Sequence, residues 1–147
     1  MDSGISLRTA QDDDREFCFA VTERAMRLYE EQTFDEWNVE EQRKRHLHDF
    51  AANRADIVSF NGEDVGIWSV VRGPTRLVLN KIYLLPEIQR QSIASSLLDR
   101  LIRESGRVRL PIHLRLPAVI PVRALYERKG FRIVRDEHPF LYMERPV

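Results

Sequence analysis

Residues 82–98 have the composition of a strand that passes through a short loop directly into a helix. The first amides of a helix have no partner within it, and the helix dipole places partial positive charge there. The loop and the first helical turn are polar, then small: Gln89, Arg90, Gln91, Ser92, Ile93, Ala94 and Ser95. Small residues let an anion approach the backbone closely, so this segment predicts a site suited to a pyrophosphate. Many strand–loop–helix joints bind nothing, so the pattern alone defines no ligand.

The other chemically reactive residue types form no second site. His46 and His48 are two residues apart in a helical segment, so they point to different faces and make no metal pair. His113 and His138 are isolated and are interpreted as structural. Cys18, the single cysteine, lies beside an apolar helix face and is expected to be an inert buried thiol. We therefore expect no metal site.

Composition limits the class of protein. The 147 residues are 43% hydrophobic and 31% charged, with 23 basic and 23 acidic side chains, and they suit one domain covering residues 1–147. Zero net charge argues against nucleic-acid binding, and arginine-rich stretches such as residues 43–45 are interpreted as solvated surface. The sequence has no apolar run long enough to span a membrane, and its first residues do not resemble a signal peptide. A cytoplasmic location without a membrane partner is expected.

Hydrophobic periodicity predicts the elements that would position the anion site. The pattern predicts strands at 5–8, 55–60, 65–71, 76–85, 108–116, 131–134 and 140–143, and helices at 13–31, from Asn38, at 93–102 and around 121–129. Asn61-Gly62 indicates a hairpin turn, and Gly106 is the expected end of the third helix. Residues 29–37 are interpreted as an aromatic, acidic connection between the first two helices. The resulting order, β-α-α-β-β-β-α-β-α-β-β, predicts an α+β fold with a mixed sheet.

Two segments carry a family resemblance. Residues 89–94, Gln-Arg-Gln-Ser-Ile-Ala, match the pattern Q/R-x-x-G-x-G/A except that Ser92 replaces the first glycine. Residues 124–131, Ala-Leu-Tyr-Glu-Arg-Lys-Gly-Phe, resemble a second signature that ends in Tyr-Glu-x-x-Gly-Phe. Both signatures are those of the GNAT superfamily of N-acetyltransferases, and with the element order they make the chain similar to that superfamily over nearly its whole length.

The resemblance implies a GNAT-like fold, in which a mostly antiparallel, twisted central sheet is splayed between two parallel strands and flanked by about four helices. The parallel strands would be residues 76–85 and 108–116, with acetyl-CoA as co-substrate in the opening between them. Backbone groups of Ile82, Tyr83 and Leu84 would bond the pantetheine arm, and the amides of residues 90–95 would bind the pyrophosphate.

The implied activity is direct transfer of the acetyl group to a primary amine. Tyr126 occupies the position of the general acid that protonates the leaving thiolate; the alternative is that it is only a packing residue with its hydroxyl bonded elsewhere. Lys81 stands where related chains often carry an acidic base. The remaining base candidates are Glu30, Glu31, Asp35 and Glu36, or a water held by Tyr29 or Asn80.

The resemblance also places the acceptor side near the connection between the first two helices. The substrate-binding candidates are Tyr29, Gln32, Phe34, Trp37 and Tyr142. An acidic and aromatic wall would favour a cationic amine on a small molecule or peptide. The alternative is that Phe34 and Trp37 anchor the connection on the core.

Three positions depart from the family pattern: Lys81, Ser92 and Ile120, the last standing where a capping asparagine is common. They leave open a second function, a catalytically degenerate acyl-CoA-binding or regulatory module. Pairing of the last strands into a homodimer is common among similar proteins and is possible here.

Overall fold

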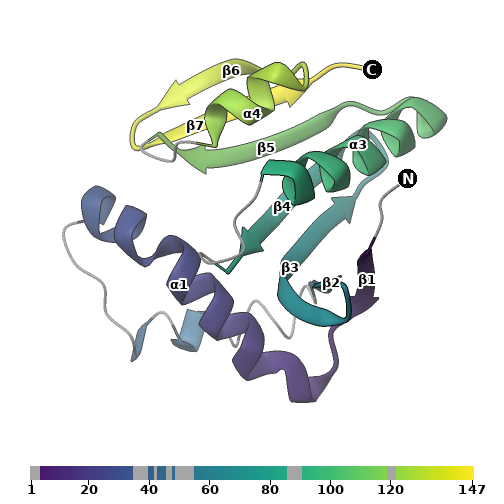
Figure 1. Ribbon diagram of the computed structural model, residues 1–147. Helices are drawn as coiled ribbons and strands as arrows, with labels where there is room; N and C mark the ends of the chain where they lie inside the picture. The colour runs from purple at the N-terminus through teal and green to yellow at the C-terminus, as the bar shows by residue number, and fades with distance from the viewer. Residues whose placement is uncertain are drawn as a thin grey trace. The chain divides into compact units, whose positions relative to one another are not determined.

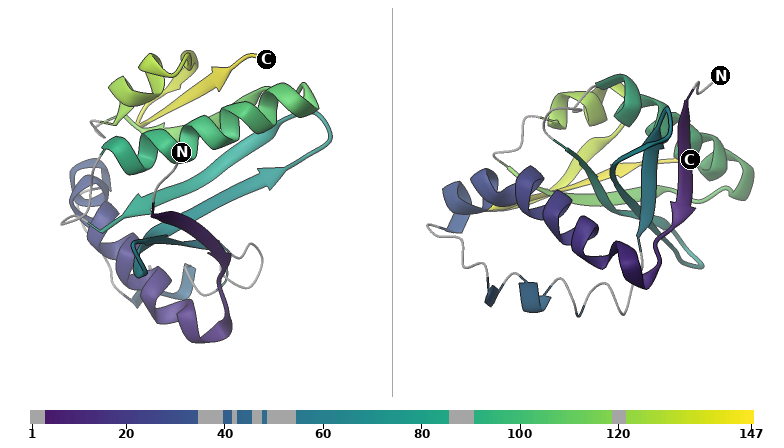
Figure 2. Two further views of the ribbon diagram at one scale, coloured as in Figure 1. Left: turned by 45° about the vertical axis from the view of Figure 1, so that its right-hand side comes forward. Right: turned by 60° about the horizontal axis from the view of Figure 1, so that its bottom comes forward.

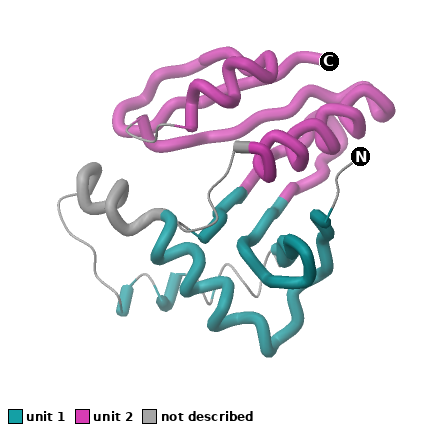
Figure 3. Tube along the Cα trace, in the orientation of Figure 1, with its two compact units in different colours: residues 1–69, 81–89 teal, residues 70–80, 90–147 magenta. Residues whose placement is uncertain are grey.

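The structure is a computed structural model that describes residues 4–34, 40–41, 43–45, 48, 55–85, 91–118 and 122–147. For residues 26–34 and 91 it describes the backbone alone. The chain divides into two compact units, residues 1–69 with 81–89 and residues 70–80 with 90–147 (Figure 3). Strands β3 (Glu63–Arg72) and β4 (Leu77–Leu84) each contribute to both units.

The first unit is an antiparallel sheet with a long helix. Strand β1 (Ile5–Thr9) pairs with β2 (Asp56–Phe60), and β2 pairs with β3. A short 3-10 helix, η1 (Asp12–Asp14), leads into α1 (Arg15–Phe34), shown in Figure 1. Residues 29–34 are therefore helical, and the expectation that the inter-helix connection begins at Tyr29 is wrong. No helix breaker interrupts this stretch, so α1 continues through it.

The turn between β2 and β3 forms as its sequence predicts. Asn61 and Gly62 have φ of 53° and 86°, and the register places Phe60 opposite Glu63. Two successive positive φ values are those of a type I′ turn, whose twist matches that of the flanking strands. The turn fixes which face of β2 and β3 meets α1.

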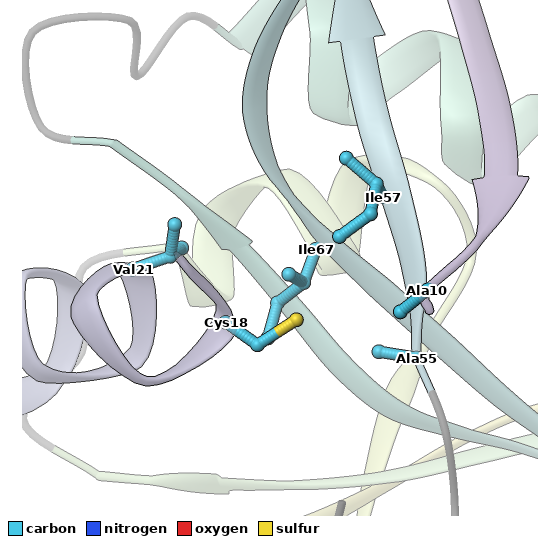
Figure 4. Packing of buried hydrophobic residues seen from close by; sticks show 6 residues of the cluster. All are labelled: Ala10, Cys18, Val21, Ala55, Ile57 and Ile67. Carbon is cyan, nitrogen blue, oxygen red and sulfur yellow. The ribbon is translucent and has the colours of Figure 1, made fainter. Parts of the chain in front are cut away.

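The core of this unit joins α1 to the sheet. Cys18 and Val21 of α1 lie against Ile57 of β2 and Ile67 of β3, and Ala10 and Ala55 complete the cluster (Figure 4). All are at least 96% buried by relative exposure. Two partly buried residues of β4 and its continuation, Tyr83 and Leu85, pack against the same cluster. The end of β4 is thus anchored by side-chain packing within the first unit.

The second unit contains α3 (Gln91–Val108), β5 (Ile112–Pro117), α4 (Arg123–Arg128), β6 (Arg132–Glu137) and β7 (Phe140–Arg145). Helix α3 runs beside β5, which returns in the opposite direction (Figures 1 and 2). Ile93, Leu97, Leu98 and Leu101 are buried at helical spacing, as the sequence pattern predicts. Strand β5 pairs in parallel with β4 and antiparallel with β7, and β6 pairs with β7 at the sheet edge.

Helix α3 ends later than predicted. It passes through Gly106 to Val108, and Arg109, with φ of 58°, takes the left-handed conformation that follows the helix. The amide of Leu110 donates to the carbonyl of Ser105 (3.2 Å), which is the long hydrogen bond of a Schellman motif. The buried Ser105 hydroxyl also donates to the Leu110 carbonyl. Because these bonds fix the helix end, β5 starts at Ile112 rather than Val108.

The predicted fold class is confirmed. The strand order is β1-β2-β3-β4-β5-β7-β6, with one parallel pair, β4–β5, between antiparallel pairs. The second predicted helix is represented by helical residues at 40–41, 43–45 and 48, and Asn38 lies outside the described residues. The prediction of one domain over residues 1–147 stays a prediction. In the part of the chain that is described, no helix has both the length and the apolar character needed to cross a membrane.

Candidate functional site

The amino end of α3 has the features required of an anion site. Its first turn contains no acidic residue, so no side chain there opposes a negative charge. Ser92 is exposed and Ser95 is half-buried, whereas Ile93 and Ala94 are buried and hold the first turn against the core. Gln89, Arg90 and the side chain of Gln91 lie outside the described residues. The helix start therefore combines amide donors, small exposed side chains and a fixed position.

The three predicted pantetheine contacts lie on the last half of strand β4. Ile82 and Tyr83 are half-buried and Leu84 is buried. The Leu85 amide donates to the Val65 carbonyl (2.8 Å), which holds the end of β4 to β3. Tyr83 and Leu85 also pack on the core of the first unit, so the backbone between them has a fixed course.

The parallel pairing between β4 and β5 is short. It joins Leu77 to Ile112 and Val78 to His113, although both strands are described over their whole lengths and continue beyond these positions. In register, the next partners would be Leu79 with Leu114 and Asn80 with Arg115, and neither pair forms. Two neighbouring parallel strands that stop pairing leave backbone amides and carbonyls that a ligand rich in amides can satisfy.

Tyr126 lies on α4, at the predicted helix. Its side chain is 5% exposed and its ring meets that of Phe131 in an edge-to-face arrangement. The Tyr126 carbonyl accepts from the amides of Lys129 and Phe131, both at 3.0 Å. This is the burial that a packing residue requires, and it also gives the hydroxyl a fixed direction, so both interpretations of Tyr126 remain.

The end of α4 is held by contacts that sequence analysis missed. Lys129 Nζ lies 2.8 Å from Asp99 Oδ1 on α3, and the Lys129 carbonyl accepts from Arg145 Nε (2.7 Å). Gly130 follows with φ of 96°, as expected for a glycine that ends a helix. The basic residue before the glycine was a visible signal, but its partner on another helix was not.

The acceptor-side candidates are only partly described. Tyr29, Gln32 and Phe34 lie in the last turns of α1 as backbone, their side chains are outside the described residues, and so is Trp37. Tyr142 on β7 is half-buried, with the Arg135 guanidinium 4.0 Å from its ring centroid. Next to it, Arg115 of β5 lies 4.2 Å from the ring of Phe140. Tyr142 therefore belongs to a sheet face of arginine–aromatic contacts.

The candidates for the general base are also only partly described. Glu30 and Glu31 lie in α1 without described side chains, and Asp35 and Glu36 lie outside the described residues. Asn80 is exposed and Lys81 is half-buried on β4. No base is assigned.

Cys18 is buried in the core and His113 contacts charged neighbours. Burial raises the pKa of the Cys18 thiol to about 11, which keeps it protonated. His113 Nε2 lies 2.8 Å from Glu144 Oε2, and His113 also approaches Arg76. Among the residues that the structure describes, no group of three His, Cys, Asp or Glu side chains could hold a metal ion.

A family model described as an acetyltransferase (GNAT) domain matches residues 50–133, more than half of the chain and both signature segments. The chain belongs to the GNAT acetyltransferase family. The predicted resemblance is thereby confirmed.

Solved structures show the same fold. The PaiA N-acetyltransferase from Thermoplasma acidophilum in complex with coenzyme A has a TM-score of 0.74 at 15% identity, covering 97% of this chain and 99% of that one. The ribosomal-protein-S18-alanine N-acetyltransferase from Escherichia coli has a TM-score of 0.70 at 19% sequence identity, and the match covers 97% of this chain and 94% of that one. A GNAT family acetyltransferase from Elizabethkingia anophelis with acetyl-CoA bound has a TM-score of 0.69 at 11% sequence identity, and the match covers 98% of this chain and 99% of that one. No curated protein matches this sequence significantly.

Proposed function

We propose that this protein is an N-acetyltransferase that moves the acetyl group of acetyl-CoA to a primary amine of a small molecule or peptide. The observation that carries the proposal is the family match across residues 50–133, which contains both the loop at 89–94 and the Tyr126 segment. The coenzyme A and acetyl-CoA bound to two similar structures support the choice of co-substrate.

In this proposal, the pantetheine arm bonds the backbone of Ile82, Tyr83 and Leu84. The pyrophosphate lies on the start of α3, at Gln89, Arg90, Gln91, Ser92, Ile93, Ala94 and Ser95. The absence of acidic residues from the first turn of α3 and the short β4–β5 pairing support these assignments. Acceptor contacts are assigned to Tyr29, Gln32, Phe34, Trp37 and Tyr142.

The chemistry moves protons at both the nitrogen and the sulfur. The acceptor ammonium loses a proton to a base, the neutral nitrogen attacks the thioester carbonyl and then loses a second proton, and the carbon–sulfur bond breaks to give the amide and a thiolate. We assign Tyr126 as the acid that protonates the departing thiolate, because its hydroxyl is an O–H donor on the segment that matches the family signature. The burial of its ring supports a fixed donor.

Calorimetric titration with acetyl-CoA tests the proposal, followed by an amine screen in which released thiol is measured. We expect micromolar binding and turnover with at least one primary amine. Failure to bind at millimolar acetyl-CoA would contradict the proposal.

The second candidate is a degenerate acyl-CoA-binding or regulatory module, favoured by Lys81 at the strand position and Ser92 in the loop. It predicts binding of acetyl-CoA without turnover across the whole amine screen. The Ser92→Gly variant tests the loop itself: tighter binding of acetyl-CoA than in wild type would show that the serine side chain obstructs the loop.

A further inference from the structure

Gly66, in the middle of β3, lies directly beneath the backbone of β4. A Cβ atom built on Gly66 would meet the carbonyl oxygen of Tyr83 at a distance that real Cβ atoms do not adopt. It would also lie 2.7 Å from Leu84 Cδ2 and 3.1 Å from Leu84 Cα. Two of these three atoms belong to the backbone, so a side-chain rotation alone cannot make room.

This contact is unusual for two strands of one sheet. Neighbouring strands lie about 4.7–4.9 Å apart, and a Cβ atom points out of the pleat rather than at the partner's backbone. The Tyr83–Leu84 peptide therefore lies closer to Gly66 than any side chain at position 66 would allow. One residue further along β4, the Leu85 amide donates to the Val65 carbonyl and joins the two strands.

Side-chain packing holds the Tyr83–Leu84 peptide in this position. Tyr83 and Leu85 pack against the core cluster of the first unit, and Leu84 is buried. Gly66 of β3 is also held in place: it is buried, and it pairs with Val58 of β2 on its other side. A methyl group at position 66 would have to push the Tyr83–Leu84 peptide away from β3 against this packing.

We propose that Gly66 is a positioning residue for cofactor binding: its lack of a side chain sets the course of the Tyr83–Leu84 backbone and thereby the direction of the groups that bond the pantetheine arm. This inference rests on the proposed function, because it needs Ile82–Leu84 to be the pantetheine contact. It adds a residue that lies outside both family signatures.

The test compares Gly66→Ala with Gly106→Ala, a matched control. Gly106 lies in α3, and a Cβ built there has no atom within 4 Å. Each protein is titrated with acetyl-CoA and with adenosine 3′,5′-bisphosphate, which has the nucleotide but no pantetheine arm. We expect Gly66→Ala to lose affinity for acetyl-CoA by at least about tenfold, as when one or two hydrogen bonds are lost. Its affinity for the bisphosphate, and both affinities of Gly106→Ala, should stay within about twofold of wild type.

The outcomes separate this inference from the proposed function. If wild type binds neither ligand, the proposed function fails and the inference fails with it. If wild type binds both, but Gly66→Ala keeps its acetyl-CoA affinity or loses affinity for both ligands equally, only the inference is overturned. An equal loss is what general destabilisation produces.

If Gly66→Ala does not fold, amide hydrogen exchange in the wild type tests the premise that the proposal requires, namely that the pantetheine arm bonds the backbone at this end of β4. Acetyl-CoA should protect the amides of residues 83–85 more than the bisphosphate does. Equal protection by both ligands would overturn the proposal.

Discussion

The ring of Tyr126 meets the ring of Phe131 edge-on, with centroids 5.6 Å apart and planes inclined by 61°. The same two residues are joined through the backbone, where the Phe131 amide donates to the Tyr126 carbonyl (3.0 Å). The ring position is therefore fixed independently of the hydroxyl. A variant that removes only the hydroxyl leaves both contacts intact.

Tyr126→Phe is expected to lower kcat by about 10²- to 10³-fold, as expected for the loss of a general acid. Affinity for acetyl-CoA should stay within about twofold of wild type, because the ring and its packing remain. Steady-state kinetics with the best acceptor and calorimetry check this. An unchanged kcat would show that Tyr126 is a packing residue only.

Asp14 makes the native state sensitive to acid. Its carboxylate accepts from Arg8 (2.8 Å) and from the Gln11 amide (2.8 Å), and these bonds lower its pKa from 3.8 to about 2. Because the folded pKa is below the unfolded one, the stabilisation is complete above about pH 4 and is lost as the pH falls towards 2. Urea unfolding between pH 2 and 7 measures it.

Asp14→Asn should lose this pH dependence and destabilise the protein by about 1 kcal/mol at pH 7. Asp13→Asn, an exposed neighbour in the same short helix, is the matched control and should change little. Equal effects of the two substitutions would contradict the role of Asp14.

Ser105 secures the end of α3. It is fully buried and donates from Oγ to the Leu110 carbonyl. Ser105→Ala should destabilise the protein by about 1–2 kcal/mol, because it leaves that carbonyl without this donor. Thermal unfolding measures the change, with Ser96→Ala on the same helix as a control that should not lower the Tm. A Tm for Ser105→Ala equal to wild type would refute the assignment.

Cys18 should resist thiol reagents in the native protein. Its side chain is 1% exposed and its raised pKa leaves little thiolate at neutral pH. Reaction with a disulfide reagent should proceed only at the rate of unfolding and become fast in denaturant. Rapid native modification with loss of activity would instead place the thiol near the substrates.

Sequence reasoning succeeded where the signal is local. The Asn61-Gly62 turn needs only two adjacent residues, and the apolar face of α3 needs only its own periodicity. It failed at Gly106 because the end of α3 is set by hydrogen bonds of Ser105 with Leu110, which no composition pattern indicates. The candidate site follows the same rule. The motif at residues 89–94 was visible in the sequence, whereas the role of Gly66 exists only once β4 lies over it.

The left-handed backbone conformation of Arg109 lowers the stability of the protein, and a substitution can recover this stability. A non-glycine residue in the left-handed conformation costs about 1 kcal/mol, so Arg109→Gly offers a stabilising substitution at an exposed position in the α3–β5 connection. New acceptor specificities usually arise from substitutions that weaken a fold, and a reserve of this kind offsets their cost. A lineage or a laboratory selection that acquires the glycine first would tolerate a wider range of later mutations at the proposed acceptor site.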